Sequence, residues 1–148
     1  MDETEYRQPT DDDELSQALA LRREIFIDEE GRDRLVESDD YDLTAHHIIA
    51  VRDRAVVGTL RLYLLNPTDT DIKIGRVAVK KDMRREGIGR SLMEAAHQWA
   101  GAQFDSIYLH AQVQMVGFYE KFGYACEGGV FMESGTEHIV MRRLPEAS

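Results

Sequence analysis

Residues 80–90 gather basic side chains around two glycines. The stretch holds five positive and two negative side chains, so its net charge is +3, whereas the whole chain carries −10. Its polar members and glycines are Lys80, Lys81, Asp82, Arg84, Arg85, Glu86, Gly87, Gly89 and Arg90. A positively charged stretch in an acidic chain is typical of a site that attracts an anion.

The basic stretch lies between two segments of different periodicity. Residues 72–79 are mostly β-branched or apolar, which predicts a strand. Leu92, Ala96 and Trp99 recur at helical spacing, which predicts a helix over residues 89–100. Glycines let the main chain turn sharply, and the first N–H groups of a helix have no partner within it. The pattern therefore predicts a phosphate-binding helix N-terminus.

Three alternative roles for the glycine pair fit less well. An ordinary connecting loop with solvated charges does not account for arginines on both sides of the glycines. A Walker A loop requires GxxxxGK[ST], which is absent. A dinucleotide-binding loop requires a third glycine, where this chain has Leu92.

The segment Arg84-x-x-Gly87-x-Gly89 resembles the (Q/R)xxGx(G/A) signature of GNAT acetyltransferases. The resemblance covers roughly residues 15–144 and is strongest to the small ElaA-type subgroup. The other segments that carry it are Leu21–Phe26, His46–His47, Ala111–Gln114 and Phe118–Tyr124.

The resemblance implies a binding site for acetyl-coenzyme A. It implies that Val77, Ala78 and Val79 bind the pantetheine arm through the main chain, and that an N–H of this strand stabilises the developing oxyanion. It implies that the coenzyme pyrophosphate binds to Arg84, Arg85, Glu86, Gly87, Ile88, Gly89 and Arg90. The thioester is already activated, so direct transfer to an amine requires orientation but no metal.

The resemblance also implies that Tyr119 protonates the departing thiolate. A thiol has a pKa of about 8.5, so a neighbouring proton donor with a pKa near that value helps it to leave. The alternative is a tyrosine that packs in the core against Met115 and Phe122, on the same helical face.

The acceptor is expected to be an amine of a small molecule or peptide. Glu24, His110 and Gln112 are the candidates for substrate binding. Each has a structural alternative, respectively a solvated surface, strand packing and a helix cap. No general base stands out, and water can carry the proton instead.

The segments that must position these residues alternate between helical and extended patterns. A helix is predicted over residues 12–25, then a loop with a short helical turn from Phe26 to Leu43. Strands are predicted at 46–51, 55–64, 72–79 and 107–111, helices at 89–100 and 113–122, and a closing hairpin at 124–132 and 138–143. The order predicts one mixed α/β (α+β) domain over residues 1–148, with a mostly antiparallel sheet flanked by helices, as in the GNAT fold.

Composition excludes several other classes of protein. The net charge of −10 argues against nucleic-acid binding, and no apolar run approaches the roughly 20 residues of a membrane span. Cys126 is the single cysteine, has no metal-binding partner pattern and is expected to be buried or half-buried. These features favour the cytoplasm and predict no metal site.

The acidic charge itself can arise in two ways. It can attract a cationic substrate, or it can reflect adaptation to high salt, since four lysines stand against fourteen arginines and fourteen aspartates. The function predicted is N-acetyl transfer. The alternatives are a coenzyme A-binding regulatory domain without turnover and a nucleotide-binding protein. The resemblance further suggests a homodimer formed through the C-terminal strands.

Overall fold

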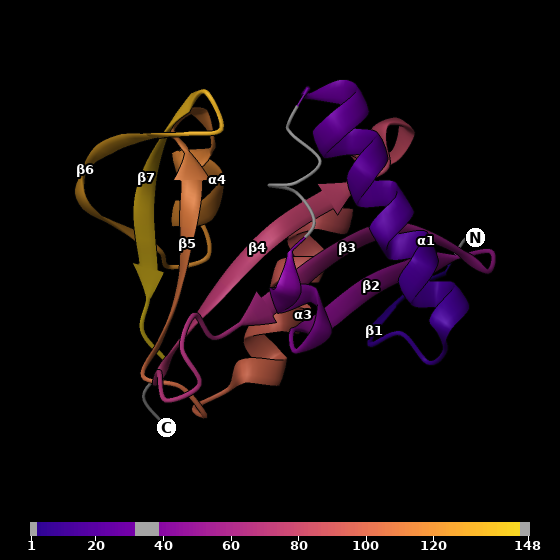
Figure 1. The fold of residues 1–148 in the computed structure, drawn as a ribbon, viewed down its shortest axis with the longest axis horizontal. Helices are drawn as coiled ribbons and strands as arrows, with labels where there is room; N and C mark the ends of the chain where they lie inside the picture. The colour runs from indigo at the N-terminus through magenta and orange to yellow at the C-terminus, as the bar shows by residue number, and fades with distance from the viewer. Residues whose placement is uncertain (1–2, 32–38, 146–148) are drawn as a thin grey trace. The chain divides into compact units, whose positions relative to one another are not determined.

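The computed structural model describes residues 3–31 and 39–145. The chain forms two compact units, one from Met1–Tyr63 with Arg76–Trp99, the other from Leu64–Gly75 with Ala100–Ser148. Figure 1 shows the helices and strands along the chain.

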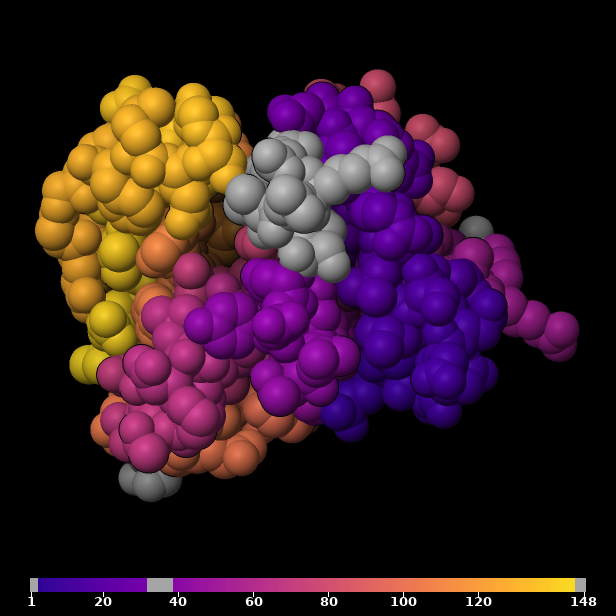
Figure 2. Space-filling model, in the orientation of Figure 1, coloured from indigo at the N-terminus to yellow at the C-terminus, as the bar shows by residue number. Residues whose placement is uncertain are grey.

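The first unit contains three consecutive antiparallel strands and the helices that pack on them. Its elements are β1 (Thr4–Arg7), α1 (Asp12–Arg22), η1 (Arg23–Glu29), η2 (Asp40–Leu43), β2 (His46–Arg52), β3 (Ala55–Tyr63), the end of β4 (Asp71–Val79), η3 (Lys81–Met83) and α3 (Ile88–Ala100). Strand β2 pairs with both β1 and β3. Asp53 and Arg54 join β2 to β3 with φ of +50° and +66°, as a tight hairpin turn requires. This turn projects from the surface (Figure 2).

Helix α1 begins where its sequence predicts and continues further than predicted. The Asp11 side chain accepts a hydrogen bond from the Glu14 N–H at 2.8 Å, and acidic residues fill the first turn, which favours a helix N-terminus. The predicted end at residue 25 is wrong, as is the loop predicted from Phe26. The chain continues as the π-helical segment η1 to Glu29 because Ile25 and Phe26 are buried in the core.

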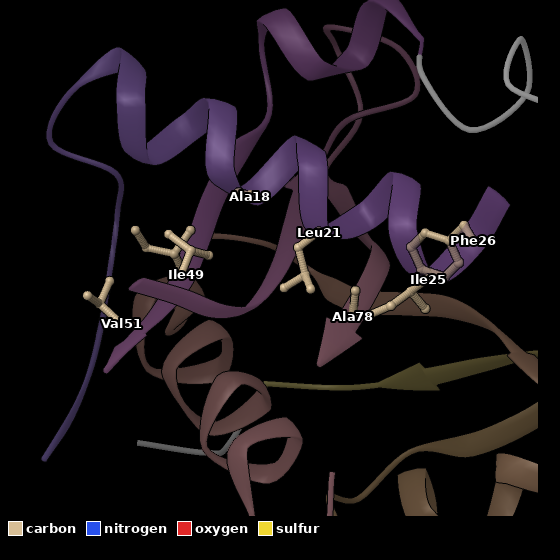
Figure 3. Close-up of a cluster of buried hydrophobic side chains, with 8 residues drawn as sticks. Ala18, Leu21, Ile25, Phe26, Ile49, Val51 and Ala78 are labelled. Carbon is tan, nitrogen blue, oxygen red and sulfur yellow. The ribbon is translucent and has the colours of Figure 1, made fainter. Parts of the chain in front are cut away.

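The core of the first unit lies between α1 and the strands below it (Figure 3). Eight side chains form this cluster: Ala18, Leu21, Ile25, Phe26, Ile49, Val51, Val56 and Ala78. Helix α3 packs on the opposite face of these strands. The end of β4 therefore contributes Ala78 to the core beneath α1. Burial of Ala78 in this core holds the strand end in place.

The second unit contains a four-stranded arrangement with a short helix. Its elements are the start of β4, then β5 (Ser106–Gln112), η4 (Val113–Met115), α4 (Val116–Glu120), β6 (Ala125–Glu133) and β7 (Thr136–Arg143). Strands β4 and β5 pair in parallel, in a register that runs from Asp71↔Ser106 to Lys73↔Tyr108. Strand β7 pairs antiparallel with both β5 and β6.

The hydrogen-bonded strand order is β1-β2-β3-β4-β5-β7-β6, and β4 contributes residues to both units. This confirms the predicted mixed, mostly antiparallel sheet flanked by helices. The sequence did not predict β1, whose four residues are largely polar.

Cys126 is exposed, so the prediction that it is buried or half-buried is wrong. It lies on β6, whose side chains are mostly accessible. Within the described ranges, no helix is long and apolar enough to span a membrane.

Candidate active site

The end of β4 is held on both sides by main-chain and side-chain contacts. Ala78 is buried, whereas Val77 and Val79 are half-buried, so alternate side chains face the core. The Lys80 N–H donates to the Val57 carbonyl at 2.8 Å, and the Arg84 Nε donates to the Val79 carbonyl at 3.1 Å. These contacts fix the main chain at the point where the strand leads into the basic loop.

Arg84 joins the basic loop to the end of η1. Its two terminal nitrogens donate to the two carboxylate oxygens of Glu29 at 2.6 and 2.8 Å. This paired hydrogen bond raises the pKa of Arg84 and lowers the pKa of Glu29. The guanidinium is therefore already matched by a carboxylate, so Arg84 holds the loop in position in addition to any contact with a ligand.

The other charged residues of the loop divide into paired and unpaired groups. Glu86 accepts a hydrogen bond from Arg52 at 2.7 Å, and Arg90 donates to Glu94 one helical turn later at 2.9 Å. Arg85 is exposed and makes no hydrogen bond or ion pair with the described residues. Arg85 is thus the loop arginine whose charge is most available to an anion.

Gly87 directly precedes helix α3 and has a conformation that favours glycine. Its φ is +83°, and a Cβ built there would meet no atom within 4 Å, so the space beside it is open. The first hydrogen bond of the helix runs from the Ser91 N–H to the Gly87 carbonyl at 3.0 Å. The N–H groups of residues 88–90 precede that bond, which is the arrangement that binds anions at helix N-termini.

Gly58 lets α3 approach β3 closely. A Cβ at Gly58 would lie 3.0 Å from Ile88 Cγ2 and 3.1 Å from Leu92 Cδ1, closer than side chains pack without moving. Ile88 and Leu92 are themselves buried. The first turn of α3 therefore packs directly against β3 at Gly58, and this packing determines the position of the N-terminal N–H groups of the helix.

Tyr119 lies in an aromatic cluster of the second unit. Its ring contacts Phe118 edge-on at 5.1 Å and Tyr124 at 6.1 Å between centroids. Desolvation raises the pKa of Tyr119 to about 12, although part of the side chain stays accessible. The phenol therefore keeps its proton near pH 7, and its pKa lies above the value of about 8.5 that best suits proton transfer to a thiolate. Phe118 also contacts Phe122, as expected of a packing residue.

The three residues predicted to bind the acceptor have different surroundings. Glu24 is exposed on η1, and its charge raises the pKa of Arg84 together with other carboxylates. Gln112 accepts a hydrogen bond from Gln114 at 2.6 Å and makes no side-chain cap on η4. His110 is the one of the three that belongs to a cluster of charged side chains.

That cluster surrounds Glu133, which the sequence predicts in a turn. The His110 Nδ1 lies 2.9 Å from the Glu133 Oε1, and the Lys73 Nζ lies 3.4 Å from the same nitrogen. The hydrogen bond from His110 lowers the pKa of Glu133 to about 2. The alternation of side chains along each strand places these residues on one face, but their pairing depends on strand register and was not predictable from spacing.

His46 and His47 occupy consecutive positions of β2, so their side chains face opposite sides of the sheet. The His46 ring stacks on Trp99 with centroids 3.7 Å apart, and its Nδ1 lies 2.8 Å from Gln8 Nε2. His47 is buried, and its Nε2 lies 3.0 Å from the Asp42 carbonyl oxygen. Both contacts are those of packing residues.

Two buried arginines connect η2 to the core of the first unit. The sequence pattern did not predict them. Arg22 donates to Asp42 at 2.6 Å, and Arg61 donates to Asp39 at 2.6 Å and to Asp42 at 2.9 Å. Burial opposes ionisation of both aspartates, but the hydrogen bonds from the arginines hold their pKa values below the usual range. Both arginine side chains are only 1% exposed, so the pairs stabilise the position of η2.

No group of three or more His, Cys, Asp or Glu side chains arranged to hold a metal ion occurs in the parts of the chain that the structure describes. The first unit offers a helix N-terminus beside a basic loop, which suits the binding of a phosphorylated ligand. The second unit offers a phenol and a histidine–carboxylate pair.

Comparison with known proteins matches the sequence to a family. Residues 16–145 match the family described as the acetyltransferase (GNAT) domain. A candidate acetyltransferase of Bacillus subtilis is 31% identical over 144 residues, which cover 94% of this chain and 95% of that protein.

Solved structures show the same fold. An acyl-CoA N-acyltransferase from Pseudomonas aeruginosa is 31% identical, with a TM-score of 0.83 and coverage of 97% of this chain and 99% of that one. ElaA from Escherichia coli is 28% identical, with a TM-score of 0.84 and the same coverage.

Proposed function

Because this chain belongs to the acetyltransferase (GNAT) domain family, we propose that it transfers an acetyl group from acetyl-coenzyme A directly to an amine of a small molecule or peptide. The observation that carries the proposal is the start of α3, where Gly87 leads from a basic loop into a helix whose first N–H groups precede its first hydrogen bond. We further propose that residues 1–148 act as one catalytic domain in the cytoplasm.

In this proposal the coenzyme pyrophosphate binds the N–H groups at the start of α3. Arg85 contributes charge directly, because it has no partner among the described residues. Arg84 and Glu86 keep the loop in shape through Glu29 and Arg52. The remaining loop positions, Ile88, Gly89 and Arg90, supply main-chain contacts, and buried Ile88 also anchors the helix.

The pantetheine arm binds along Val77, Ala78 and Val79 in this proposal. A main-chain N–H of this strand then stabilises the carbonyl oxygen as it becomes negative. Tyr119 donates its proton to the sulfur that leaves, since the phenol is protonated near pH 7. Glu24 and Gln112 contact the acceptor.

Replacement of Gly87 tests the coenzyme site. Gly87→Glu places a negative side chain in open space beside the helix start and is expected to abolish coenzyme A binding. Gly128→Glu is the matched control, because Gly128 also has positive φ (+70°) and nothing within 4 Å of a built Cβ. Isothermal titration calorimetry with coenzyme A measures both, and unchanged affinity in Gly87→Glu would refute the assigned loop.

Turnover separates an enzyme from a coenzyme-binding regulatory domain. Acetyl-coenzyme A is incubated with ethylamine, trifluoroethylamine or a peptide with one lysine, and free coenzyme A is measured by chromatography. Amine-dependent release supports the enzyme. If the protein binds coenzyme A tightly but none of the amines causes release of free coenzyme A from acetyl-coenzyme A, the regulatory domain is supported. Tighter binding of ATP than of coenzyme A supports a nucleotide-binding protein.

A further inference from the structure

The end of η1 supplies a carboxylate to the basic loop of the same unit. Glu29 is the last residue of η1, and its two carboxylate oxygens accept hydrogen bonds from the two terminal nitrogens of Arg84 at 2.6 and 2.8 Å. Both side chains are accessible, since 34% of Glu29 and 39% of Arg84 is exposed. The hydrogen bonds from Arg84 lower the pKa of Glu29, and the charge of Lys81 contributes a smaller part. An ionised carboxylate of the chain itself therefore occupies the paired donors of Arg84.

A contact that does not involve Glu29 orients the Arg84 guanidinium. Its Nε donates to the Val79 carbonyl at 3.1 Å, while its two terminal nitrogens face Glu29. Two parallel N–H donors on a planar guanidinium suit a phosphate as well as a carboxylate. Arg84 can therefore present the same two donors to either anion, and the Val79 contact persists when one anion replaces the other.

The loop also keeps its shape through contacts away from Glu29. The Lys80 N–H donates to the Val57 carbonyl at 2.8 Å, and Arg52 donates to Glu86 at 2.7 Å. One of these contacts lies before Arg84 in the chain and the other after it. The loop is thus fixed on both sides of Arg84, so loss of the Glu29 contact leaves these two supports in place.

A pyrophosphate at the start of α3 meets Glu29 as a second anion. Two anions that share the same N–H groups each form weaker hydrogen bonds, and negative groups close together repel each other. Binding therefore requires that Glu29 moves away from Arg84 or stays beside a like charge. Either outcome opposes binding, so either makes the affinity for coenzyme A lower than the loop alone would give.

We infer that Glu29 is an internal competitor for the coenzyme phosphates, which occupies Arg84 in place of the ligand and limits the affinity for coenzyme A. The inference rests on the proposed function, because it concerns the same anion site. It also gives coenzyme A a route of release, since Glu29 returns to Arg84 as the phosphate leaves. The adjacent carboxylate of Asp28 is exposed and makes no hydrogen bond or ion pair with the described residues, so the effect belongs to Glu29.

Glu29→Gln tests the inference by the sign of its effect. The amide has nearly the same size but no charge, so coenzyme A is expected to bind about threefold more tightly, a change of the size found for accessible ion pairs. The melting temperature is expected to fall, because the ion pair with Arg84 is lost. Asp28→Asn is the matched control, since it removes one negative charge from the neighbouring residue and should leave the affinity unchanged.

Two further titrations locate the effect. In a protein that already carries Arg84→Gln, the change Glu29→Gln should not alter the affinity for coenzyme A, because the competition acts through Arg84. Inorganic pyrophosphate, which has neither pantetheine nor adenosine, should show the same gain in Glu29→Gln as coenzyme A does. Isothermal titration calorimetry measures both.

Three results would overturn the inference. Equal or weaker binding of coenzyme A by Glu29→Gln is the first, because a purely structural role predicts loss of affinity together with loss of stability. An equal gain in Asp28→Asn is the second, since the effect would then be one of overall charge. The third is a full gain from Glu29→Gln in the Arg84→Gln protein, which would show that Arg84 does not mediate it.

Failure of the proposed function is a separate result. If the wild-type protein does not bind coenzyme A, the proposed function fails, and the titration with inorganic pyrophosphate then decides the role of Glu29. Tighter binding of pyrophosphate by Glu29→Gln than by wild type supports the competitor. Equal binding, or no binding by either protein, overturns it.

Discussion

At the scale of single residues, the candidate site separates side chains that hold the loop from side chains that can act on a ligand. Arg84 directs its hydrogen bonds to Glu29 and the Val79 carbonyl, whereas Arg85 has no partner among the described residues. The signature in the sequence specifies Arg84 and leaves the position of Arg85 open. Their different roles depend on Glu29, which is 55 residues away from Arg84.

This difference predicts opposite effects for two neighbouring substitutions. Arg84→Gln is expected to lower the melting temperature, because it leaves Glu29 unpaired and frees the loop. Arg85→Gln is expected to leave the melting temperature unchanged and to weaken coenzyme A binding several-fold. Thermal unfolding and calorimetry on both variants measure this. Equal loss of stability in the two variants would contradict the assigned roles.

The raised pKa of Tyr119 predicts how activity responds to pH. Since the pKa is about 12, the phenol keeps its proton at pH 8 to 10, and no loss of rate in that range should come from its ionisation. Tyr119→Phe should lower kcat while the KM for acetyl-coenzyme A changes little, and Tyr6→Phe on β1 is the control. Equal kcat in wild type and Tyr119→Phe would remove Tyr119 from the acid role.

The same shift affects stability at high pH. Tyrosine in the unfolded chain ionises near pH 10, whereas folded Tyr119 resists ionisation up to about pH 12. The unfolded state therefore gains from ionisation first, so stability falls as the pH rises above about 10. Below that pH both states are neutral and the group has no effect on stability.

At the scale of elements, the position of α3 depends on the absence of a side chain at Gly58. Gly58→Ala is expected to lower the free energy of unfolding by about 1–3 kcal/mol, since the added methyl group overpacks against Ile88 and Leu92. It should also weaken coenzyme A binding by moving the helix start. Gly129→Ala on β6 is the control, because nothing lies within 4 Å of a Cβ built there. Urea unfolding of both variants measures the difference, and equal stability would contradict the close seating of α3.

Most elements were predictable because their signals are local. The helical spacing of Leu92, Ala96 and Trp99 and the turn at Asp53 and Arg54 are each contained in a short window. The missed features are contacts between distant segments. Strand β1 is too short and polar to show a period, and its assignment depends on pairing with β2. The π-helical end of α1 depends on burial of Phe26.

In the candidate site, too, the parts with local sequence signals were predictable and the contacts between distant segments were not. The glycine signature lies within six residues, so the loop and helix start were located correctly in the fold. The pairing of His110 with Glu133 joins strands separated by 23 residues, and only register reveals it. The loop between Phe26 and Leu43 falls partly outside the described residues, and its short helical turn is confirmed at Asp40–Leu43.

At the scale of the whole molecule, the net charge of −10 sets how the chain responds to salt. Raising KCl from about 0.1 to about 1 M shortens the screening length from about 10 to about 3 Å. Repulsion among acidic groups then weakens, so the melting temperature should rise. Calorimetric scans at both salt concentrations measure this, and a constant or lower melting temperature would exclude adaptation to salt as the reason for the charge.

Salt also tests whether the charge attracts the acceptor. If it does, the KM for ethylamine, a cation at neutral pH, should rise between the same two salt concentrations. The KM for uncharged trifluoroethylamine should stay constant and serves as the internal control. Equal changes for both amines would show that the acidic surface does not steer the substrate.

The exposed Cys126 has a practical consequence for anyone who follows the reaction with a chromogenic thiol reagent. Because Cys126 is the single cysteine of the chain and lies at the surface, it should react with such a reagent before any turnover. The initial absorbance then corresponds to one thiol per protein molecule and gives the baseline of the progress curve. Cys126→Ser would remove this background, while the native thiol offers a single attachment point for a fluorescent dye.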